Sequence, residues 1–178
     1  RVQQSWKTIR YLSERGARVI ILSHIGRDPT DSIEPVARAL KKFGPVVFIG
    51  DLTGAAAQHV AASMKDGELL LLENVRRDPR EEANEESFAR ELASLGDIYV
   101  NEAFADSHRE HASIVGIPKF LPSYAGLRFE EEIVRLSGAL VPPQGAVAVI
   151  GGAKVEKNNL EISFEKTTGE FLNSVPIP

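Results

Sequence analysis

Basic side chains follow three apolar segments of the chain, each of a length typical of a buried strand. The segments and their basic residues are 18–23 followed by His24 and Arg27, 68–72 followed by Arg76, and 97–100 followed by His108 and Arg109. In open α/β sheets, ligands bind outside the carboxyl ends of the strands, so we expect these side chains to gather at one edge. Guanidinium groups bind phosphate and carboxylate through two parallel hydrogen bonds. The pattern predicts a site for a small polyanion.

A second interpretation of these residues stays open, because an arginine at the end of a strand is usually solvated. Arg77 and Arg80 lie among the acids Asp78, Glu81 and Glu82, and we expect surface ion pairs there that contribute little stability. A histidine is likewise more often a hydrogen-bonded structural residue than a ligand. On the pattern alone, an anion site and a set of solvated side chains are equally supported.

Two glycines and a lysine follow a further apolar segment, residues 146–150. They are Gly151, Gly152 and Lys154. Glycines after a strand let backbone N–H groups approach a phosphate, and a lysine adds a point charge. The spacing of a P-loop is absent, so the motif by itself predicts only a tight turn with a solvated lysine.

The elements that must position these residues alternate along the chain. Segments typical of buried strands are 18–23, 46–49, 68–72, 97–100 and 146–150. Segments with helical spacing of apolar residues are 2–15, 33–43, 55–65, 87–95 and 127–140, with Ser32 as a candidate N-cap of the second. The alternation predicts a doubly wound, mostly parallel α/β sheet with helices on both faces, a three-layer, Rossmann-like fold.

Composition narrows the class of protein. The chain has 178 residues, 43% hydrophobic and 26% charged, which favours one packed domain, with at most an appendage. It has no cysteine, which excludes a disulfide scaffold and fits a reducing compartment, so we expect a cytoplasmic protein. No apolar run is long enough for a membrane helix. With 21 basic and 25 acidic residues, neither nucleic acid nor a membrane is an expected partner.

Six segments, taken together, resemble the N-terminal, 3-phosphoglycerate-binding domain of the phosphoglycerate kinase family. They are residues 23–27 (Ser-His-Ile-Gly-Arg), 72–76 (Leu-Glu-Asn-Val-Arg), 99–104 (Tyr-Val-Asn-Glu-Ala-Phe), 108–113 (His-Arg-Glu-His-Ala-Ser), 115–122 (Val-Gly-Ile-Pro-Lys-Phe-Leu-Pro) and 150–155 (Ile-Gly-Gly-Ala-Lys-Val). They occur in the family's order, and the resemblance extends over about residues 1–155.

The resemblance implies a glycolytic kinase that transfers a phosphoryl group reversibly between 1,3-bisphosphoglycerate and Mg-ADP, giving 3-phosphoglycerate and Mg-ATP. It also implies a monomer. The substrate-binding residues it implies are Arg1, His24, Arg27, Arg76, His108 and Arg109, with His108 rather than His111 facing the site. Arg1 and Lys154 match residues credited with catalysis in the family. Gly152, Lys154 and Lys157 match nucleotide contacts, although Lys157 follows Lys154 by three residues where the family has four.

The implied organisation has three parts. Residues 1–141 form the phosphoglycerate-binding domain, residues 142–157 form the hinge and the start of the nucleotide domain, and residues 158–178 resemble the C-terminal segment that folds back on the first domain. Most of the family's nucleotide site has no counterpart here, so we expect the chain alone to be inactive or incomplete. In the family an extended segment before the position of Arg1 supplies an interior strand, so we expect unpaired backbone in the sheet.

The binding loops depart from the family pattern at three places. Asp28 precedes Pro29 where the family has Gly-Arg-Pro, Arg77 replaces an aromatic residue, and residues 105–107 (Ala-Asp-Ser) replace Gly-Thr-Ala. These changes predict an altered affinity for the substrate. The alternative function is a non-catalytic anion-binding or interaction module, or a folding fragment, on the same scaffold.

Overall fold

The computed structural model describes residues 2–26, 28–140, 154–156 and 159–161. The chain divides into two compact units, Arg1–Ala139 and Leu140–Pro178, and each is considered by itself. The boundary predicted at residue 141 lies outside the described residues, as does the strand predicted at 146–150. Within the described ranges, no helix combines the length and the apolar character needed to cross a membrane.

A three-stranded parallel sheet lies at the centre of the first unit. Its strands are β1 (Val19–Ile21), β2 (Val47–Phe48) and β3 (Leu69–Leu71), in the order β1-β3-β2. Leu70 of β3 is in register with Ile20 of β1 and with Val47 of β2. These strands confirm three of the predicted apolar segments, each in a shorter form.

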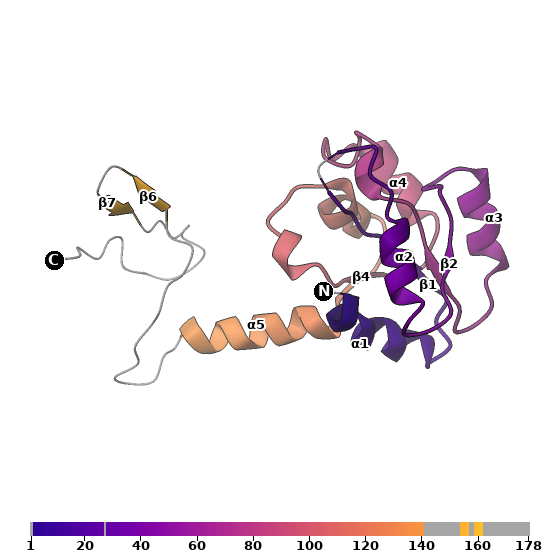
Figure 1. Cartoon of the computed structure of the whole chain (residues 1–178), viewed down its shortest axis with the longest axis horizontal. Helices are drawn as coiled ribbons and strands as arrows, with labels where there is room; N and C mark the ends of the chain where they lie inside the picture. Colours follow the sequence, from indigo (N-terminus) through magenta and orange to yellow (C-terminus); the bar gives the residue numbers. More distant parts are fainter. Residues whose placement is uncertain (1, 27, 141–153, 157–158, 162–178) are drawn as a thin grey trace. The chain divides into compact units, whose positions relative to one another are not determined.

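Helices cover both faces of this sheet (Figure 1). They include α1 (Val2–Ser13), α2 (Glu34–Leu40) and α3 (Ala55–Ser63). Leu69 and Leu71 pack in one cluster with side chains of α1 and α2, whereas Leu70 and Leu72 pack in another with Ala57 of α3. Because successive side chains of a strand point to opposite faces, β3 is buried on both sides. The fold is therefore the predicted α/β class with helices on both faces of a parallel sheet.

The rest of the first unit includes a second, smaller sheet. Its strands β4 (Tyr99–Asn101) and β5 (Ser123–Ala125) pair in parallel. Between them lie the short helices η2 (Phe104–Asp106), η3 (Ala112–Gly116) and η4 (Ile117–Lys119). The helix α4 (Glu86–Ala93) packs against η3 and η4 through the fully buried Phe88, Ala89 and Ala112. The sequence did not predict β5, because its three residues are exposed and carry no apolar pattern.

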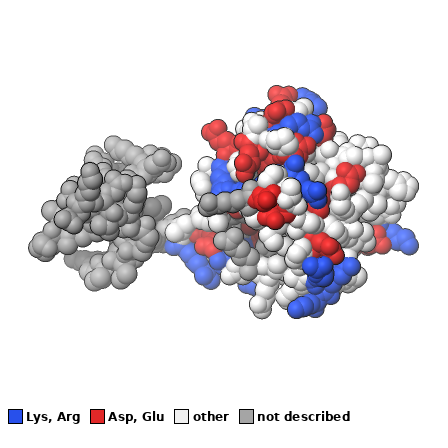
Figure 2. Space-filling model, turned by 45° about the horizontal axis from the view of Figure 1, so that its top comes forward, with Lys and Arg blue, Asp and Glu red and all other residues white. Residues whose placement is uncertain are grey.

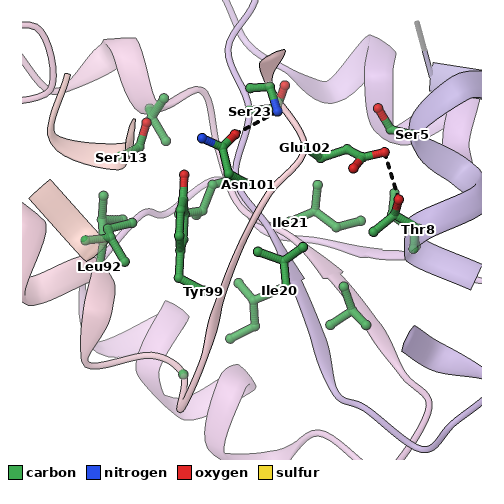
Figure 3. Close-up of a pocket in the computed structure, with 18 of the residues that line it drawn as sticks. Ser5, Thr8, Ile20, Ile21, Ser23, Leu92, Tyr99, Asn101, Glu102 and Ser113 are labelled. Atoms are coloured by element: carbon green, nitrogen blue, oxygen red, sulfur yellow. Dashed lines mark hydrogen bonds between the residues drawn. The ribbon is translucent and has the colours of Figure 1, made fainter. Parts of the chain in front are cut away.

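One edge of β1 and one edge of β4 lack a strand partner among the described residues. A cavity of about 1820 Å³ is lined by residues of both strands. Figure 3 shows Ile20 and Ile21 of β1 and Tyr99 and Asn101 of β4 around it. The residues of β1 and β4 are only partly buried, in contrast to the fully covered β3.

A buried hydrogen-bonded junction joins α1, β4 and the last helix of the unit, α5 (Leu127–Leu140). The Thr8 hydroxyl donates to Glu102 Oε1 (2.8 Å) and accepts from the backbone N–H of Leu127 (3.0 Å). Figure 3 shows the Thr8–Glu102 bond at the cavity wall. A Cβ at Gly126 would overlap the Glu102 carboxylate, which explains a glycine at the start of α5.

Thr8→Val is expected to lower the free energy of unfolding by about 1–3 kcal/mol, because valine has the same shape but can neither donate to Glu102 nor accept from the Leu127 N–H. Urea unfolding followed by circular dichroism measures the change. Thr30→Val is the matched control, since Thr30 lies on the exposed surface, and its expected effect is within about 0.5 kcal/mol. Equal effects of the two substitutions would contradict a structural role for this junction.

The second unit contains an antiparallel pair, β6 (Lys154–Glu156) and β7 (Asn159–Glu161), with Val155 opposite Leu160. The sequence pattern predicted no strand beyond residue 157. The structure contains β7 there, so this prediction is wrong. Two residues separate the strands, which is a common length for a hairpin connection. The remainder of the segment predicted as a tail, residues 162–178, lies outside the described residues.

Candidate functional site

The loop after β3 is built on two buried polar residues, Glu73 and Asn74. The Glu73 carboxylate accepts hydrogen bonds from the backbone N–H groups of Ile33 and Asn74 (both 2.8 Å) and from the Ser32 hydroxyl (3.0 Å). Burial disfavours the charged form of Glu73, but these hydrogen bonds outweigh it and lower the pKa of its carboxyl. Glu73 therefore ties the start of α2 to the end of β3. The Ser32 hydroxyl accepts from the N–H of Glu34 (3.2 Å), but the N-cap of α2 is Ile33, so the prediction of Ser32 as N-cap is wrong by one residue.

Asn74 fixes the loop after β1 to the same place. Its side-chain amide donates to the carbonyl oxygens of Ile25 (3.0 Å) and Asp31 (2.9 Å), and its oxygen accepts from the N–H of Arg76 (3.2 Å). Within the resembled segment 72–76, the glutamate and the asparagine are thus scaffold residues, and the arginine is left as the group that can meet a ligand.

Asn74→Ala is expected to lower the free energy of unfolding by about 2–3 kcal/mol, because the two hydrogen bonds from the buried Asn74 amide to the loop carbonyl groups are lost. The substitution should also weaken anion binding, since the 24–31 loop loses its attachment. Chemical denaturation gives the first effect and a phosphoglycerate titration of the folded variant gives the second. Gln3→Ala, which removes an exposed amide on α1, serves as control and should change neither quantity measurably.

Arg76 lies at the meeting point of the two loops. Its Nη1 donates to the carbonyl oxygen of Gly26 (2.9 Å), and its side chain is only 10% exposed. Its Nε lies 3.2 Å from Glu82 Oε1 but lacks the alignment of a hydrogen bond, and among the described residues it has no other partner. A buried guanidinium with a donor still unpaired can bind an anion from within the loop cluster.

The loop after β4 brings further charged groups to the carboxyl end of the strands, where the loops after β1 and β3 also lie. Arg109 Nε lies 3.2 Å from Asp106 Oδ1, and the Arg109 backbone N–H donates to the Asp106 carbonyl oxygen (3.0 Å). Asp106 and His111 line the same cavity as His24 and Arg76, and Arg109 lies next to Asp106. Burial lowers the pKa of His24, and Arg76 lowers it further, so its ring is largely neutral near pH 7.

The two histidines of the 108–113 segment occupy different environments. His108 is exposed, whereas the side chain of His111 is 16% exposed and lines the cavity together with His24 and Arg76. The expectation that His108 faces the site stays a prediction, and the structure adds His111 as a second candidate. Sequence spacing alone gave no reason to prefer either ring.

Glu81 is a buried residue of the candidate site. The sequence pattern predicted a surface acid at this position, and that prediction is wrong. It is 1% exposed, and its carboxylate accepts from the Ser113 hydroxyl (2.5 Å) and the Ser113 backbone N–H (2.9 Å). His111 Nδ1 lies 3.9 Å from Glu81 Oε1. Burial raises the pKa of the Glu81 carboxyl despite these donors. Glu81 therefore joins the loop that carries Arg76 to the segment that carries Arg109.

Arg77 and Arg80 form ion pairs as predicted, but their partners are Glu73, Asp78 and Glu91 rather than Glu81 or Glu82. Arg77 Nη1 lies 3.0 Å from Glu73 Oε2, and Arg80 contacts Asp78 (2.7 Å) and Glu91 (2.9 Å). Arg80 also lies over the ring of the buried Phe88, so part of its contribution is packing. Their charges are largely matched by these acids, and neither residue is a candidate for ligand binding.

The structure does not place the other predicted site residues relative to His24, Arg76 and Arg109. Arg1, Arg27, Gly152 and Lys157 lie outside the described residues. Lys154 begins β6 in the second unit, where its backbone is opposite Glu161. The roles implied for these residues remain predictions.

The positive charge at this edge is a local feature. Figure 2 shows basic and acidic side chains interspersed over the face in view, and the chain as a whole carries a net charge of −4. The site thus depends on the placement of His24, Arg76 and Arg109 at the ends of β1, β3 and β4. Such an arrangement can bind and orient a small molecule with phosphate and carboxylate groups.

Comparison with known proteins gives concordant results at the level of the family. The family model described as phosphoglycerate kinase matches residues 1–163. A phosphoglycerate kinase of Roseiflexus sp. (strain RS-1) is 48% identical over 165 residues, which are 87% of this chain and 42% of the relative. That of Pelotomaculum thermopropionicum is 45% identical over 176 residues, 94% of this chain and 44% of the relative. The chain spans about two fifths of the length of the curated relatives it matches.

Solved structures agree with these matches. The crystal structure of phosphoglycerate kinase from Pyrococcus horikoshii OT3 aligns with a TM-score of 0.73 at 33% identity, over 78% of this chain and 37% of the other. The structure of phosphoglycerate kinase from Coxiella burnetii aligns with a TM-score of 0.71 at 37% identity, over 82% of this chain and 38% of the other.

Proposed function

The chain belongs to the phosphoglycerate kinase family, and on that premise we propose that it binds 3-phosphoglycerate or 1,3-bisphosphoglycerate at the edge formed by His24, Arg76 and Arg109. In this proposal the chain contributes the acid-substrate half of a reversible phosphoryl transfer to and from a nucleotide. A cytoplasmic location and a monomeric state are part of the same proposal.

The observation that supports it most directly is that basic residues from three loops line one cavity. His24, Arg76 and His111 follow β1, β3 and β4, and Arg76 keeps a buried N–H without an aligned partner in the described part of the chain. Each of these groups would meet a compensating charge in a ligand that carries a phosphate and a carboxylate. A bound anion would also favour the charged form of His24, which burial and the charge of Arg76 disfavour.

The proposed reaction requires little from the protein beyond positioning of the substrates and stabilisation of charge. In the direction from ATP, the nucleophile is the carboxylate of 3-phosphoglycerate, which is already ionised at neutral pH, so no general base is needed. Its oxygen forms a bond to the γ-phosphorus, the bond from that phosphorus to the bridging oxygen breaks, and ADP leaves. Phosphoryl transfer of this kind depends mainly on positioning and on charge stabilisation.

The residues of this chain divide into two groups under this proposal. Substrate binding falls to His24, Arg76 and Arg109, together with the predicted Arg1, Arg27 and His108. Charge stabilisation of the moving phosphoryl group falls to Arg1 and Lys154, and contacts to the Mg-ATP or Mg-ADP substrate fall to Gly152, Lys154 and Lys157. The proposed organisation keeps residues 1–141 as the binding domain, 142–157 as the hinge and 158–178 as a returning C-terminal segment.

A chimeric enzyme tests the proposed function. Residues 2–137 of this chain replace the matching segment of a complete phosphoglycerate kinase such as the Roseiflexus relative, and phosphoryl transfer is assayed with ATP and 3-phosphoglycerate. We expect turnover that saturates with 3-phosphoglycerate and is strongly reduced by Arg76→Ala in the same chimera. A folded chimera without turnover would contradict the proposal and favour a non-catalytic anion-binding module.

A further inference from the structure

An acidic side chain lies within the basic cluster. It belongs to Asp106, the last residue of η2. Asp106 raises the pKa of His24, whereas Arg76, Arg109 and His111 lower it. Its position is one of the three places where the binding loops depart from the family pattern, since residues 105–107 read Ala-Asp-Ser. A negative charge at this position is unfavourable for an anion site unless it has a partner.

Its partner is Arg109. Asp106 Oδ1 lies 3.2 Å from Arg109 Nε, and the backbone N–H of Arg109 donates to the Asp106 carbonyl oxygen (3.0 Å). Asp106 and Arg109 are three residues apart in the sequence, and the turn between them brings their side chains into contact. Asp106 thus contacts one of the guanidinium donors that a phosphate or carboxylate would otherwise use.

We propose that Asp106 is an affinity-determining residue of this site, an internal counter-ion that the substrate must displace from Arg109. The inference rests on the proposed function, because it concerns the same ligand. Two effects act in the same direction. Asp106 competes with the ligand for the positive charge of Arg109, and its carboxylate repels the negative charge of the ligand as it binds.

The expected size of the effect follows from exposure. The side chains of Asp106 and Arg109 are 21% and 39% exposed, so the pair is partly screened by water. Pairs of this kind contribute modestly, and the repulsion of a multiply charged ligand adds to the cost of displacing them. We therefore expect removal of the Asp106 charge to tighten binding by about 3- to 10-fold at low salt.

Calorimetric titration of the 178-residue chain with 3-phosphoglycerate tests the proposal with Asp106→Asn, which keeps the shape and removes the charge. Its gain in affinity should shrink as the salt concentration rises, because salt screens the Asp106 charge. Glu14→Gln is the matched control. It makes the same charge change in an exposed ion pair with Arg10 of α1 and should change the affinity less than twofold.

Asp106→Thr is the second variant, and it restores the residue of the family pattern. It is measured if the asparagine variant fails to fold by circular dichroism. Tighter binding by either folded variant but not by Glu14→Gln supports the proposal. Unchanged or weaker binding overturns it, since Asp106 would then be neutral or would orient Arg109 productively. If neither the unaltered chain nor the variants bind 3-phosphoglycerate, the proposed function fails, and this inference fails with it.

Discussion

Arg109→Ala is expected to weaken the binding of 3-phosphoglycerate by about 5- to 150-fold, which corresponds to about 1–3 kcal/mol. Arg109 follows β4, lies near His24 and is partly exposed toward solvent. Alanine removes a charge-assisted hydrogen bond to the ligand, and it also leaves the Asp106 carboxylate without its partner. Both losses disfavour an anion, so the effect of the substitution should be among the largest of any single change in the site.

Calorimetry at low salt measures the affinity of this variant, and Arg38→Ala is the control. Arg38 is an exposed arginine on α2, paired with Glu34 on the same helix, and its removal changes the net charge by the same amount. General electrostatic attraction would make the two variants equal. Equal affinities, or an unchanged affinity for Arg109→Ala, would remove Arg109 from the site.

Leu71→Ala is expected to lower the free energy of unfolding by about 2–5 kcal/mol, the largest stability effect that we predict. Leu71 is 0% exposed at the middle of the parallel sheet, where it packs in the cluster of α1 and α2. Truncation removes buried apolar surface and leaves a cavity that β3, held on both edges by β1 and β2, cannot close. Domains of ordinary size have about 5–15 kcal/mol of stability in total, so the variant should be close to unfolding.

Leu136→Ala gives the matched comparison for this prediction. Leu136 is 50% exposed on α5, so the same truncation should cost less than about 1 kcal/mol. Denaturation curves of the two variants, fitted with a common slope, separate the effects. Similar losses at both positions would contradict the assignment of β3 as the central strand of the core.

The architecture could be predicted because apolar periodicity is a local signal. Four runs of β-branched and leucine residues separated by helical spacing identified β1 to β4, and the burial of Leu70 and Leu71 on opposite faces follows from that pattern. The strand β5 has no such signal, since its three residues are exposed. The strand order and the cavity beside β1 depend on contacts between distant segments, which a local pattern does not encode.

The candidate site was predictable only in its basic residues. Arginines after strands are conspicuous in a sequence, and the structure brings Arg76 and Arg109 to His24. The acids that organise them were not identified. Glu81 looks like any acid of a charged loop, and only the folding of residues 111–113 over it makes it a buried acceptor. Glu102 pairs with Thr8 from the other end of the domain, so no spacing rule could have connected them.

The most direct test of the central claim, that this edge of the sheet is a site for the acid substrate, is a calorimetric titration of the chain with 3-phosphoglycerate at low salt. Sulfate, which has similar charge but no carboxylate or carbon chain, is the control anion. We expect saturable binding of 3-phosphoglycerate that sulfate reproduces only weakly. Equal binding of the two anions, or no binding by a chain that unfolds cooperatively, would contradict it.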